Sequence, residues 1–532
     1  MKTLTKILVL TAVSSVVLAL ILSMPAHAQL RGLTGSTPYV LPVDTRTETI
    51  SLLTVDNTGA AADDVVPKFG GGSYGMVGIP DGLGAFDNGD GTFTLLVNHE
   101  LGSASGVVRD HGGRGAFVSR WSVSKNTLNV LYGGDLIKQV YGWDPLRQQL
   151  NTTPEVVNFN RFCSADLPEV TAFYDPRDGS GTQVRIYMHG EEGGATGWAV
   201  ATIVTGPDAG KSYILGGFNL ATNGSRLEGV GAWENLVASP FPQTKTVVIG
   251  LNDGGTGIMN NSVAVYVGTK QRVGQTEIEK AGLTNGTLQF VNVAGNPREI
   301  VDTTTRATNI TNGTRFTLSA TASTAFSRPE DGAWNPLNRN QFYFVTTDQL
   351  DLVSDGLGAQ IGRTRLWRLN FDDVRRPELG GTIDLLIDGR TEHGEKVNMF
   401  DNMTVNLTTG RVILQEDPGN AIHNAKIWEY DPSTFTGVTN TGTLTMIVKH
   451  DPARFGDRVN GVTTPSALPF NNDEESSGII DITHIMRTSR LHLGNTGEAW
   501  YVSVDQAHYT TGITPEQVEG GQIFVIHRLG SR

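Results

Sequence analysis

Several residue types on which enzyme sites are often built are scarce in this chain. Cys163 is the only cysteine among 532 residues, so neither an intramolecular disulfide nor a CxxC motif can form. The 11 histidines are scattered and show no HxxxH pattern, which argues against a histidine-rich zinc site. No P-loop motif is present, which argues against nucleotide hydrolysis.

Long helices and positive charge are also scarce. Apolar residues with helical spacing are hard to find, and the best short stretch is 276–283. Glycine is abundant instead, at 64 residues, and it falls in turns between short apolar segments, as in β-hairpins. The formal net charge of −13 argues against nucleic acid binding through a basic surface and is compatible with bound cations. We therefore expect an all-β protein with no nucleic acid partner.

The N-terminus has the features of a secretory signal. Lys2 and Lys6 precede an apolar stretch over 7–24, and Ala26-His27-Ala28 is a small-residue cleavage motif. An uncleaved membrane anchor is the alternative, because the apolar stretch approaches spanning length. We expect a cleaved signal peptide over 1–28, a periplasmic or extracellular protein, and no membrane contact after cleavage.

The rest of the chain divides at about residue 70. Residues 29–70 are rich in Thr, Gly and Asp, and we expect a loosely structured lead-in there. The domain proper then covers 71–532, and we expect it to be monomeric. The last strand, 522–527, should complete a sheet whose other strands come from elsewhere in the chain.

Six times along the chain a short apolar strand ends on acidic or amide groups, and a second strand follows. The first strands are 94–100, 186–192, 247–253, 342–348, 412–417 and 500–505. Their partners are 116–123, 198–204, 263–267, 365–370, 426–430 and 522–527. A repeat of roughly 80 residues made of strands indicates a β-propeller with loop insertions. We predict a six-bladed propeller.

A second set of acidic residues and one thiol precedes these strand pairs. It consists of Asp81, Cys163 with Asp166, Glu228 with Glu234, Glu330 with Asp331, Asp401, and Asp473 with Glu474 and Glu475. The start of one strand and the end of its antiparallel partner lie at the same side of a sheet. Both acidic sets should therefore face one mouth of the tunnel, where uncompensated carboxylates would repel each other.

These residues also have an ordinary explanation. Asp and Asn at strand ends commonly cap turns, and any single carboxylate is better explained in that way. Glutamate has no special turn role, so its recurrence at Glu100, Glu192, Glu330, Glu416 and Glu475 favours metal binding. Oxygen ligands alone indicate calcium, whereas a thiolate among them indicates a softer metal. Composition by itself favours a buried, inert Cys163, and Arg328 fits a salt-bridge partner as well as an oxyanion clamp.

In their order and spacing these motifs resemble the PhoX-type alkaline phosphatases. The matching elements are Asn98-His99-Glu100, Cys163-Ser164, Glu191-Glu192, Trp233-Glu234-Asn235, Asn252-Asp253-Gly254, Arg328-Pro329-Glu330, Asn335-Pro336, Asp401-Asn402, Gln415-Glu416-Asp417-Pro418-Gly419 and Glu474-Glu475-Ser476-Ser477-Gly478. They extend over about residues 70 to 510. The resemblance implies a secreted six-bladed propeller that binds calcium and iron.

The resemblance also implies residue roles. Iron would be held by Glu100, Cys163, Glu234 and Glu330, with Cys163 as a thiolate. Calcium would be held by Glu192, Asp253, Glu416, Asp417 and Glu475. Arg328 would bind the phosphate of a small-molecule phosphoester.

The leading hypothesis is therefore a secreted metal-dependent phosphomonoesterase. A calcium-dependent propeller hydrolase, such as a phytase or lactonase, and a calcium-stabilised binding propeller without catalysis are the alternatives.

Overall fold

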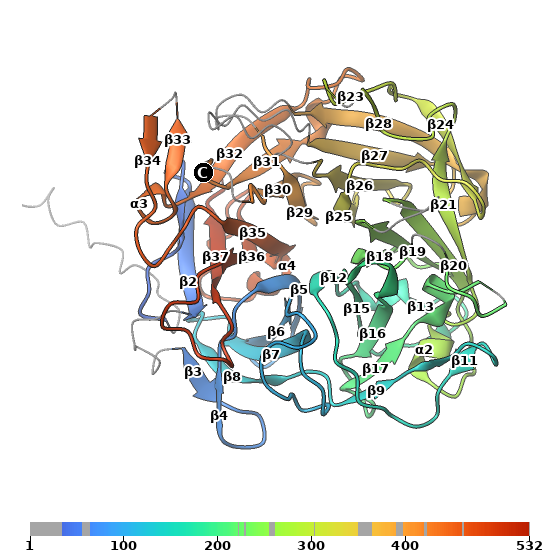
Figure 1. Ribbon diagram of the computed structural model, residues 1–532, viewed down its shortest axis with the longest axis horizontal. Helices are drawn as coiled ribbons and strands as arrows, with labels where there is room; N and C mark the ends of the chain where they lie inside the picture. Colours follow the sequence, from blue (N-terminus) through green and yellow to red (C-terminus); the bar gives the residue numbers. More distant parts are fainter. Residues whose placement is uncertain are drawn as a thin grey trace, which may run out of the picture.

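In the computed structural model, six antiparallel four-stranded blades surround a central axis, and two of them belong to one nine-stranded sheet (Figure 1). The structure describes residues 34–55, 64–221, 223–227, 230–254, 261–302, 304–348, 364–389, 397–419, 423–459 and 462–530. The predicted signal peptide over 1–28 and Glu228 lie outside these residues. Within the described ranges the all-β, six-bladed fold predicted from the sequence is confirmed.

Each blade is built on four strands, named in order from the axis outwards. Blade one consists of β5 (Pro80–Asp87), β6 (Thr92–His99), β7 (Phe117–Ser124) and β8 (Val130–Asp135). Blade two consists of β12 (Phe162–Asp166), β15 (Ile186–Glu191), β16 (Ala199–Ile203) and β17 (Lys211–Ile214). Blade three consists of β18 (Trp233–Ala238), β19 (Lys245–Asn252), β20 (Val263–Thr269) and β21 (Thr287–Val293).

The second half of the ring continues in the same way. Blade four consists of β25 (Pro329–Trp334), β26 (Gln341–Thr346), β27 (Arg365–Phe371) and β28 (Gly381–Asp388). Blade five consists of β29 (Phe400–Val405), β30 (Val412–Glu416), β31 (Lys426–Asp431) and β32 (Thr443–His450). Blade six consists of β35 (Glu474–Asp481), β36 (Ala499–Ala507), β37 (Gly520–Arg528) and β2 (Thr47–Val55).

The N-terminal strand β2 closes the ring. It pairs antiparallel with β37 from Thr47 opposite Arg528 to Val55 opposite Gly521. The last strand is thus completed from elsewhere in the chain, as expected, and this removes an exposed sheet edge. The expectation of a loose lead-in over 29–70 is wrong for 47–55, because the stretch Ile50–Val55 of this strand is buried in the core.

Further strands extend or join the blades. They are β1 (Val40–Pro42) beside β32, β9 (Gln139–Tyr141) beside β17, and β24 (Thr314–Ser319), which pairs with both β21 and β28 and so merges blades three and four. Short hairpins are β3 (Val65–Pro67) with β4 (Ser73–Gly75), β10 (Trp143–Asp144) with β11 (Gln149–Leu150), β13 (Tyr174–Asp175) with β14 (Ser180–Gly181), β22 (Ile300–Asp302) with β23 (Ala307–Thr308), and β33 (Asp457–Val459) with β34 (Val462–Thr464). A Gly-x-Ser-x-Gly match over 71–75 falls in the β3–β4 hairpin and not at a strand-to-helix turn, so it is no nucleophile elbow.

Helices are short within the described residues. They are α2 (Glu277–Lys280), α3 (Pro452–Phe455), α4 (Thr483–Met486) and the 3₁₀ turns Val170–Ala172, Gly194–Thr196, Gly216–Phe218, Pro377–Leu379 and Pro432–Thr434. The helix predicted over 276–283 is α2, which begins with a capping box between Thr276 and Glu279. None of the described helices is long and apolar enough to cross a membrane.

The hydrophobic core lies between neighbouring blades. At the interface of blades three and four, Ile249 and Val265 share one cluster with Phe344 and Trp367. The strand pairs found in the sequence are the second and third strands of each blade, and the second strands are largely continuous apolar runs because both faces are buried. The sequence pattern does not predict the innermost strand, because that strand carries polar residues and glycine.

Candidate metal centre

Bulges at the starts of the inner strands turn polar side chains towards the axis. In blade two, Cys163 and Ser164 together oppose the single residue Gly190, and in blade four Glu330 and Asp331 oppose Val345. Register shifts also occur at Asp81, Glu234 and Asp401, and the shift of blade six lies further along, at Gly478. A bulge places an extra residue in one strand and re-aims its side chain. Two consecutive side chains can therefore both point into the tunnel, whereas in a regular strand consecutive side chains point to opposite faces.

The same backbone hydrogen bond recurs beside each bulge. In each blade, one acidic residue or thiol near the start of the inner strand is preceded, two positions earlier, by a residue whose carbonyl accepts a backbone hydrogen bond. The donor is the N–H of the residue directly after the second strand of the same blade. These pairs are Glu100 to Ile79, Glu192 to Arg161, Asp253 to Ala232, Thr347 to Arg328, Asp417 to Met399 and His508 to Asp473, at 2.8–3.4 Å. The starts of the inner strands and the ends of the second strands thus meet at one end of the tunnel, as the antiparallel argument required, although Asp166 of the predicted second set lines the cavity described below.

We call the acidic residues and the thiol gathered at this end the axial cluster. It comprises Asp81, Glu100, Cys163, Glu192, Glu234, Asp253, Glu330, Asp401, Asp417 and Glu475. Three trios within it have ligand atoms within 4.8 Å of one another: Asp81, Cys163 and Glu234; Glu100, Cys163 and Glu192; and Glu234, Glu330 and Asp401. Cys163 and Glu234 each belong to two trios. Acidic groups so arranged could hold metal ions.

The axial cluster contains more acidic groups than the two arginines that contact it can neutralise. Burial, and then the neighbouring carboxylates, raise the pKa of Glu234 and Asp401 well above the usual range. Burial and then Glu100 raise the pKa of the Cys163 thiol, whose Sγ donates to Glu192 Oε2 at 3.1 Å. Each raised pKa reports that a negative charge is costly there, and a cation would relieve this cost.

Arg328 lies at the edge of the axial cluster. Its Nε and Nη2 each donate to Asp253 Oδ2 at 3.1 Å, and Nη2 lies 2.8 Å from Glu330 Oε1. The residue has a φ of 58°, in the left-handed region that non-glycine residues rarely adopt. Strain of this kind persists where the surroundings enforce it, and it concentrates at functional sites.

A buried ion-pair network holds the backbone beside Arg328. Ser327 donates its N–H to Glu299 Oε2 at 2.8 Å and its hydroxyl to Asp348 Oδ1 at 2.9 Å. Glu299 is paired with Arg365, and Asp348 with Arg306. These contacts fix the segment that aims Arg328 at the axial cluster.

The structure brings most of the predicted site residues together, with one exception. Glu416 is buried behind the axial cluster, where its carboxylate accepts from Asn398 N at 2.8 Å, Lys426 N at 3.1 Å and Trp428 Nε1 at 2.7 Å. Asp417 faces the cluster, and consecutive strand residues face opposite sides. The inclusion of Glu416 beside Asp417 among the ligands is therefore corrected.

Two of the predicted strand tips also lie elsewhere. Asp348 pairs with Arg306 instead of joining the axial cluster. Strand β36 continues beyond Asp505, whose carboxylate is buried 3.1 Å from His450 Nε2. Gln506, the penultimate residue of β36, reaches the cluster instead and donates to Glu100 Oε2 at 3.0 Å.

Three residues of the site are not among the metal ligands predicted from the sequence and are not predicted as the phosphate-binding arginine. Asp81 and Asp401 belong to the axial trios, and the sequence signal for both is their place in the second acidic set. Arg161 contacts Glu100 and donates to Glu192 Oε2 at 2.6 Å. Its position two residues before Cys163, like that of Arg328 before Glu330, is the available signal.

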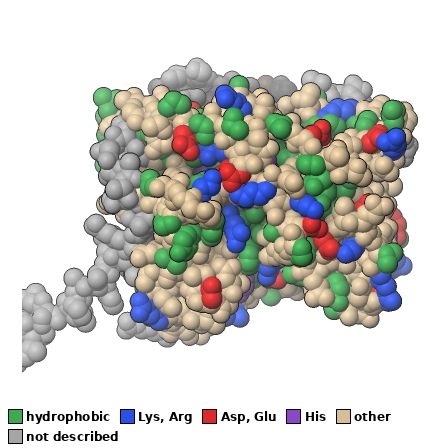
Figure 2. All heavy atoms as spheres, turned by 90° about the horizontal axis from the view of Figure 1, so that it is seen from below, with side chains coloured by type: hydrophobic (Ala, Val, Ile, Leu, Met, Phe, Trp, Pro, Cys, Tyr) green, Lys and Arg blue, Asp and Glu red, His purple; other side chains and the backbone are tan. Residues whose placement is uncertain are grey.

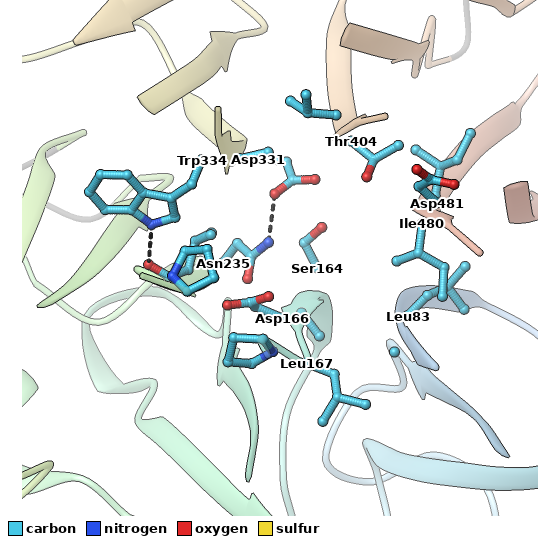
Figure 3. A pocket seen from close by; sticks show the side chains of 18 of the residues that line it. Leu83, Ser164, Asp166, Leu167, Asn235, Asp331, Trp334, Thr404, Ile480 and Asp481 are labelled. Atoms are coloured by element: carbon cyan, nitrogen blue, oxygen red, sulfur yellow. Dashed lines mark hydrogen bonds between the residues drawn. The ribbon is translucent and has the colours of Figure 1, made fainter. Parts of the chain in front are cut away.

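Polar side chains of the inner strands, next to the axial cluster in sequence, form hydrogen bonds that we call the polar floor, and Figure 3 shows the bond between Asn235 and Asp331. Asn235 donates to Asp331 Oδ1 at 2.5 Å, and Asn402 donates to Ser164 Oγ at 2.7 Å. Beyond the floor lies a cavity of about 180 Å³, lined by the far halves of the inner strands. There burial raises the pKa of Asp166 to about 8, although its Oδ2 accepts from Ala238 N at 2.8 Å.

Charge on the outer side of the ring is mixed. Figure 2 shows basic and acidic side chains interspersed with apolar ones on the side seen there. The concentration of acidic groups at the axis therefore contrasts with the outer surface in that view.

Comparison with known proteins supports the fold. No family model matches this chain, and no curated protein matches it by sequence. Among solved structures, PhoX of Pseudomonas fluorescens in complex with vanadate, a transition state analogue, aligns over 92% of this chain and 97% of its own, with a TM-score of 0.51 and 12% identity. The periplasmic gluconolactonase PpgL of Pseudomonas aeruginosa aligns over 71% and 92%, with 13% identity, but its TM-score of 0.28 carries no weight. The chain therefore has the fold of PhoX.

Proposed function

We propose that this chain is a divergent PhoX-type enzyme, a metal-dependent phosphomonoesterase that releases phosphate from organic phosphoesters. One observation carries the proposal: a guanidinium, Arg328, borders buried carboxylate trios that share Cys163 and Glu234. A cationic clamp beside a multivalent anionic pocket suits a phosphoryl group bound between metal ions and an arginine. The shared fold of a protein solved with a transition state analogue, vanadate, supports the same interpretation.

The donor set fits the metals that the family resemblance implies. Glu100, Cys163, Glu234 and Glu330 would hold iron, because a thiolate among carboxylates favours a softer metal than calcium. Glu192, Asp253, Asp417 and Glu475 would hold calcium through oxygen alone, and Asp81 and Asp401 complete the trios. When bound, such ions would supply Lewis acidity and charge neutralisation at the phosphoryl group.

The protein's own groups would position the substrate. Arg328 would bind the phosphoryl oxygens, since its planar guanidinium offers paired N–H groups and stays charged at every working pH. Asp253 and Glu330 hold that guanidinium in place, and the anchored Ser327 limits its movement. Because the donors are already oriented, little reorganisation is needed as negative charge develops.

We further propose that residues 1–28 direct export, so that the mature chain acts as a monomer outside the cytoplasm on small phosphoesters. N-terminal sequencing of the exported protein and its mass in solution test this. A mature chain that begins before residue 29, or a dimeric mass, would contradict it.

Activity measured together with metal content tests the function. We expect the purified chain to contain calcium and iron by elemental analysis and to hydrolyse p-nitrophenyl phosphate. Arg328→Lys keeps the charge but loses the two-pronged geometry, so kcat/KM should fall roughly a hundredfold or more, while metal content and Tm stay close to wild type. Arg177→Lys is the matched control, because Arg177 pairs with Asp175 at 2.6 Å on the surface.

Two outcomes would contradict the proposal. If Arg328→Lys loses activity only in proportion to lost metal or stability, Arg328 is a structural ion-pair partner. If the metal-loaded wild type is inactive on several phosphomonoesters, the binding propeller is the better account.

A further inference from the structure

Two arginines occupy equivalent positions in two blades. Arg161 stands two residues before Cys163 in blade two, and Arg328 stands two residues before Glu330 in blade four. Each carbonyl accepts the N–H that follows the second strand of its own blade, at 2.9 Å from Glu192 and 3.0 Å from Thr347. Both residues adopt left-handed backbone, with φ values of 54° and 58°. The other blades have Ile79, Ala232, Met399 and Asp473 at this position.

The two guanidinium groups also use their donors alike. Nε and Nη2 of Arg161 both donate to Glu192 Oε2, at 3.0 and 2.6 Å, and Nη2 also contacts Glu100 Oε1. Nε and Nη2 of Arg328 both donate to Asp253 Oδ2, and Nη2 also contacts Glu330. Each arginine thereby reaches an acidic residue of the preceding blade, Glu100 and Asp253 respectively. The side-chain hydrogen bonds just described for both arginines come from Nε and Nη2, and a guanidinium has a third nitrogen, Nη1, with two further donors for an anion.

Exposure separates the two arginines. The side chain of Arg328 is 29% exposed, whereas that of Arg161 is 50% exposed. Arg161 is therefore the more accessible of the two, with one blade between them. The trios connect the two positions, because Glu234 shares one trio with Cys163, two residues after Arg161, and another with Glu330, two residues after Arg328.

We propose that Arg161 binds a second anionic group of the substrate, on the side of the phosphoester that leaves. The substrate class is thus a phosphomonoester whose leaving group carries a further phosphate or carboxylate. This inference rests on the proposed function, since it takes Arg328 as the contact for the transferred phosphate. A neutral leaving group would not need a second guanidinium, whereas an anionic leaving group at a strongly acidic mouth requires a local cation.

A matched pair of substrates tests the inference. The ratio of kcat/KM for 1,3-propanediol bisphosphate to that for 1,3-propanediol monophosphate is measured in wild type, Arg161→Gln and Arg177→Gln. We expect Arg161→Gln to lower this ratio roughly tenfold to a hundredfold, as loss of a charge-assisted contact implies. Arg177, 59% exposed and paired with Asp175, is the matched control, and its variant should keep the wild-type ratio.

A binding measurement without turnover separates the two hypotheses. Titration calorimetry with methylenediphosphonate and methylphosphonate should show tighter diphosphonate binding to wild type, and Arg161→Gln should lose that preference. If wild type hydrolyses neither substrate but shows this pattern, the proposed function fails and the second anion site stands.

An unchanged substrate ratio and an unchanged diphosphonate preference in Arg161→Gln would overturn the inference. So would an unchanged ratio accompanied by more metal per chain in that variant, since Arg161 would then be a built-in cation that replaces a metal ion at Glu100 and Glu192.

Discussion

Removing cations from the axial cluster should destabilise the folded chain, and the loss should grow with pH. In the metal-free protein, burial and then mutual repulsion raise the pKa of Glu234, Asp401 and Glu475 above those of unfolded carboxyl groups. The folded state then binds more protons than the unfolded state, so its stability falls as pH rises above about 4 and towards the raised pKa. A bound metal ion replaces those protons and prevents this loss.

The size of the effect follows from a single group. A carboxyl group costs about 1.4 kcal/mol of stability for each pH unit over which it stays protonated in the folded state and is ionised in the unfolded state. Glu234 is the strongest choice for this group, because it is 3% exposed and belongs to two trios. With about 2 cal/mol/K of unfolding entropy per residue, this loss corresponds to roughly 1 °C per pH unit in this chain.

Thermal unfolding with and without excess EDTA at pH 5, 6.5 and 8 measures this pH-dependent loss of stability. The gap in Tm between metal-loaded and chelated protein should be wider at pH 8 than at pH 5, by roughly 1 °C for each pH unit over which a cluster carboxyl group stays protonated in the chelated folded state. Buried carboxyls outside the cluster, such as Glu191 with a pKa raised to about 7, act equally in both samples and cancel in the difference. A gap that is absent, or equal at all three pH values after complete metal removal, would refute the reasoning.

Four further substitutions probe individual residues. Cys163→Ser replaces a soft thiolate by a neutral hydroxyl, so elemental analysis should find most iron lost and most calcium retained; full iron and activity would make Cys163 an inert core residue. Glu416→Gln turns an amide towards three N–H donors and should cost about 1–3 kcal/mol of unfolding free energy, with metal content intact. Asp417→Asn should instead lower the metal content. The opposite pattern would restore Glu416 as a ligand. Leu53→Ala in the closing strand β2 should cost about 2–5 kcal/mol in denaturant unfolding, and a change below about 1 kcal/mol would show that ring closure by β2 contributes little.

The sequence is informative about the blades because their middle strands are buried on both faces. Runs such as those of β6, β19 and β26 are continuously apolar, and each ends on polar residues that mark the tunnel mouth. The order of these runs yields the blade number directly. Strand β2 is not predicted in the same way because its partner β37 lies at the far end of the chain, and local patterns cannot show such a pairing.

The composition of the site is harder to predict because bulges break the two-residue period. Alternation alone separates Glu416 from Asp417, and it holds there. In the inner strands it fails, since Cys163 and Ser164, or Glu330 and Asp331, both serve the axis although they are adjacent in sequence. The two-residue period of a strand therefore does not predict which of two neighbouring polar residues joins the axial cluster and which belongs to the polar floor.

The positions that precede the bulges explain why function concentrates at this end of the propeller. Ile79, Arg161, Arg328 and Met399 all adopt positive φ, at 48°, 54°, 58° and 31°, although none is glycine. Each conformation costs of order 1–3 kcal/mol and must be held by its surroundings. The repeated backbone hydrogen bond from the second strand supplies part of that hold, and it aligns the acidic residue after that strand with the bulge of the inner strand. The identity of the residue at this position therefore decides what each blade adds there: an arginine in blades two and four, the acidic residue Asp473 in blade six, and an apolar residue in the other three.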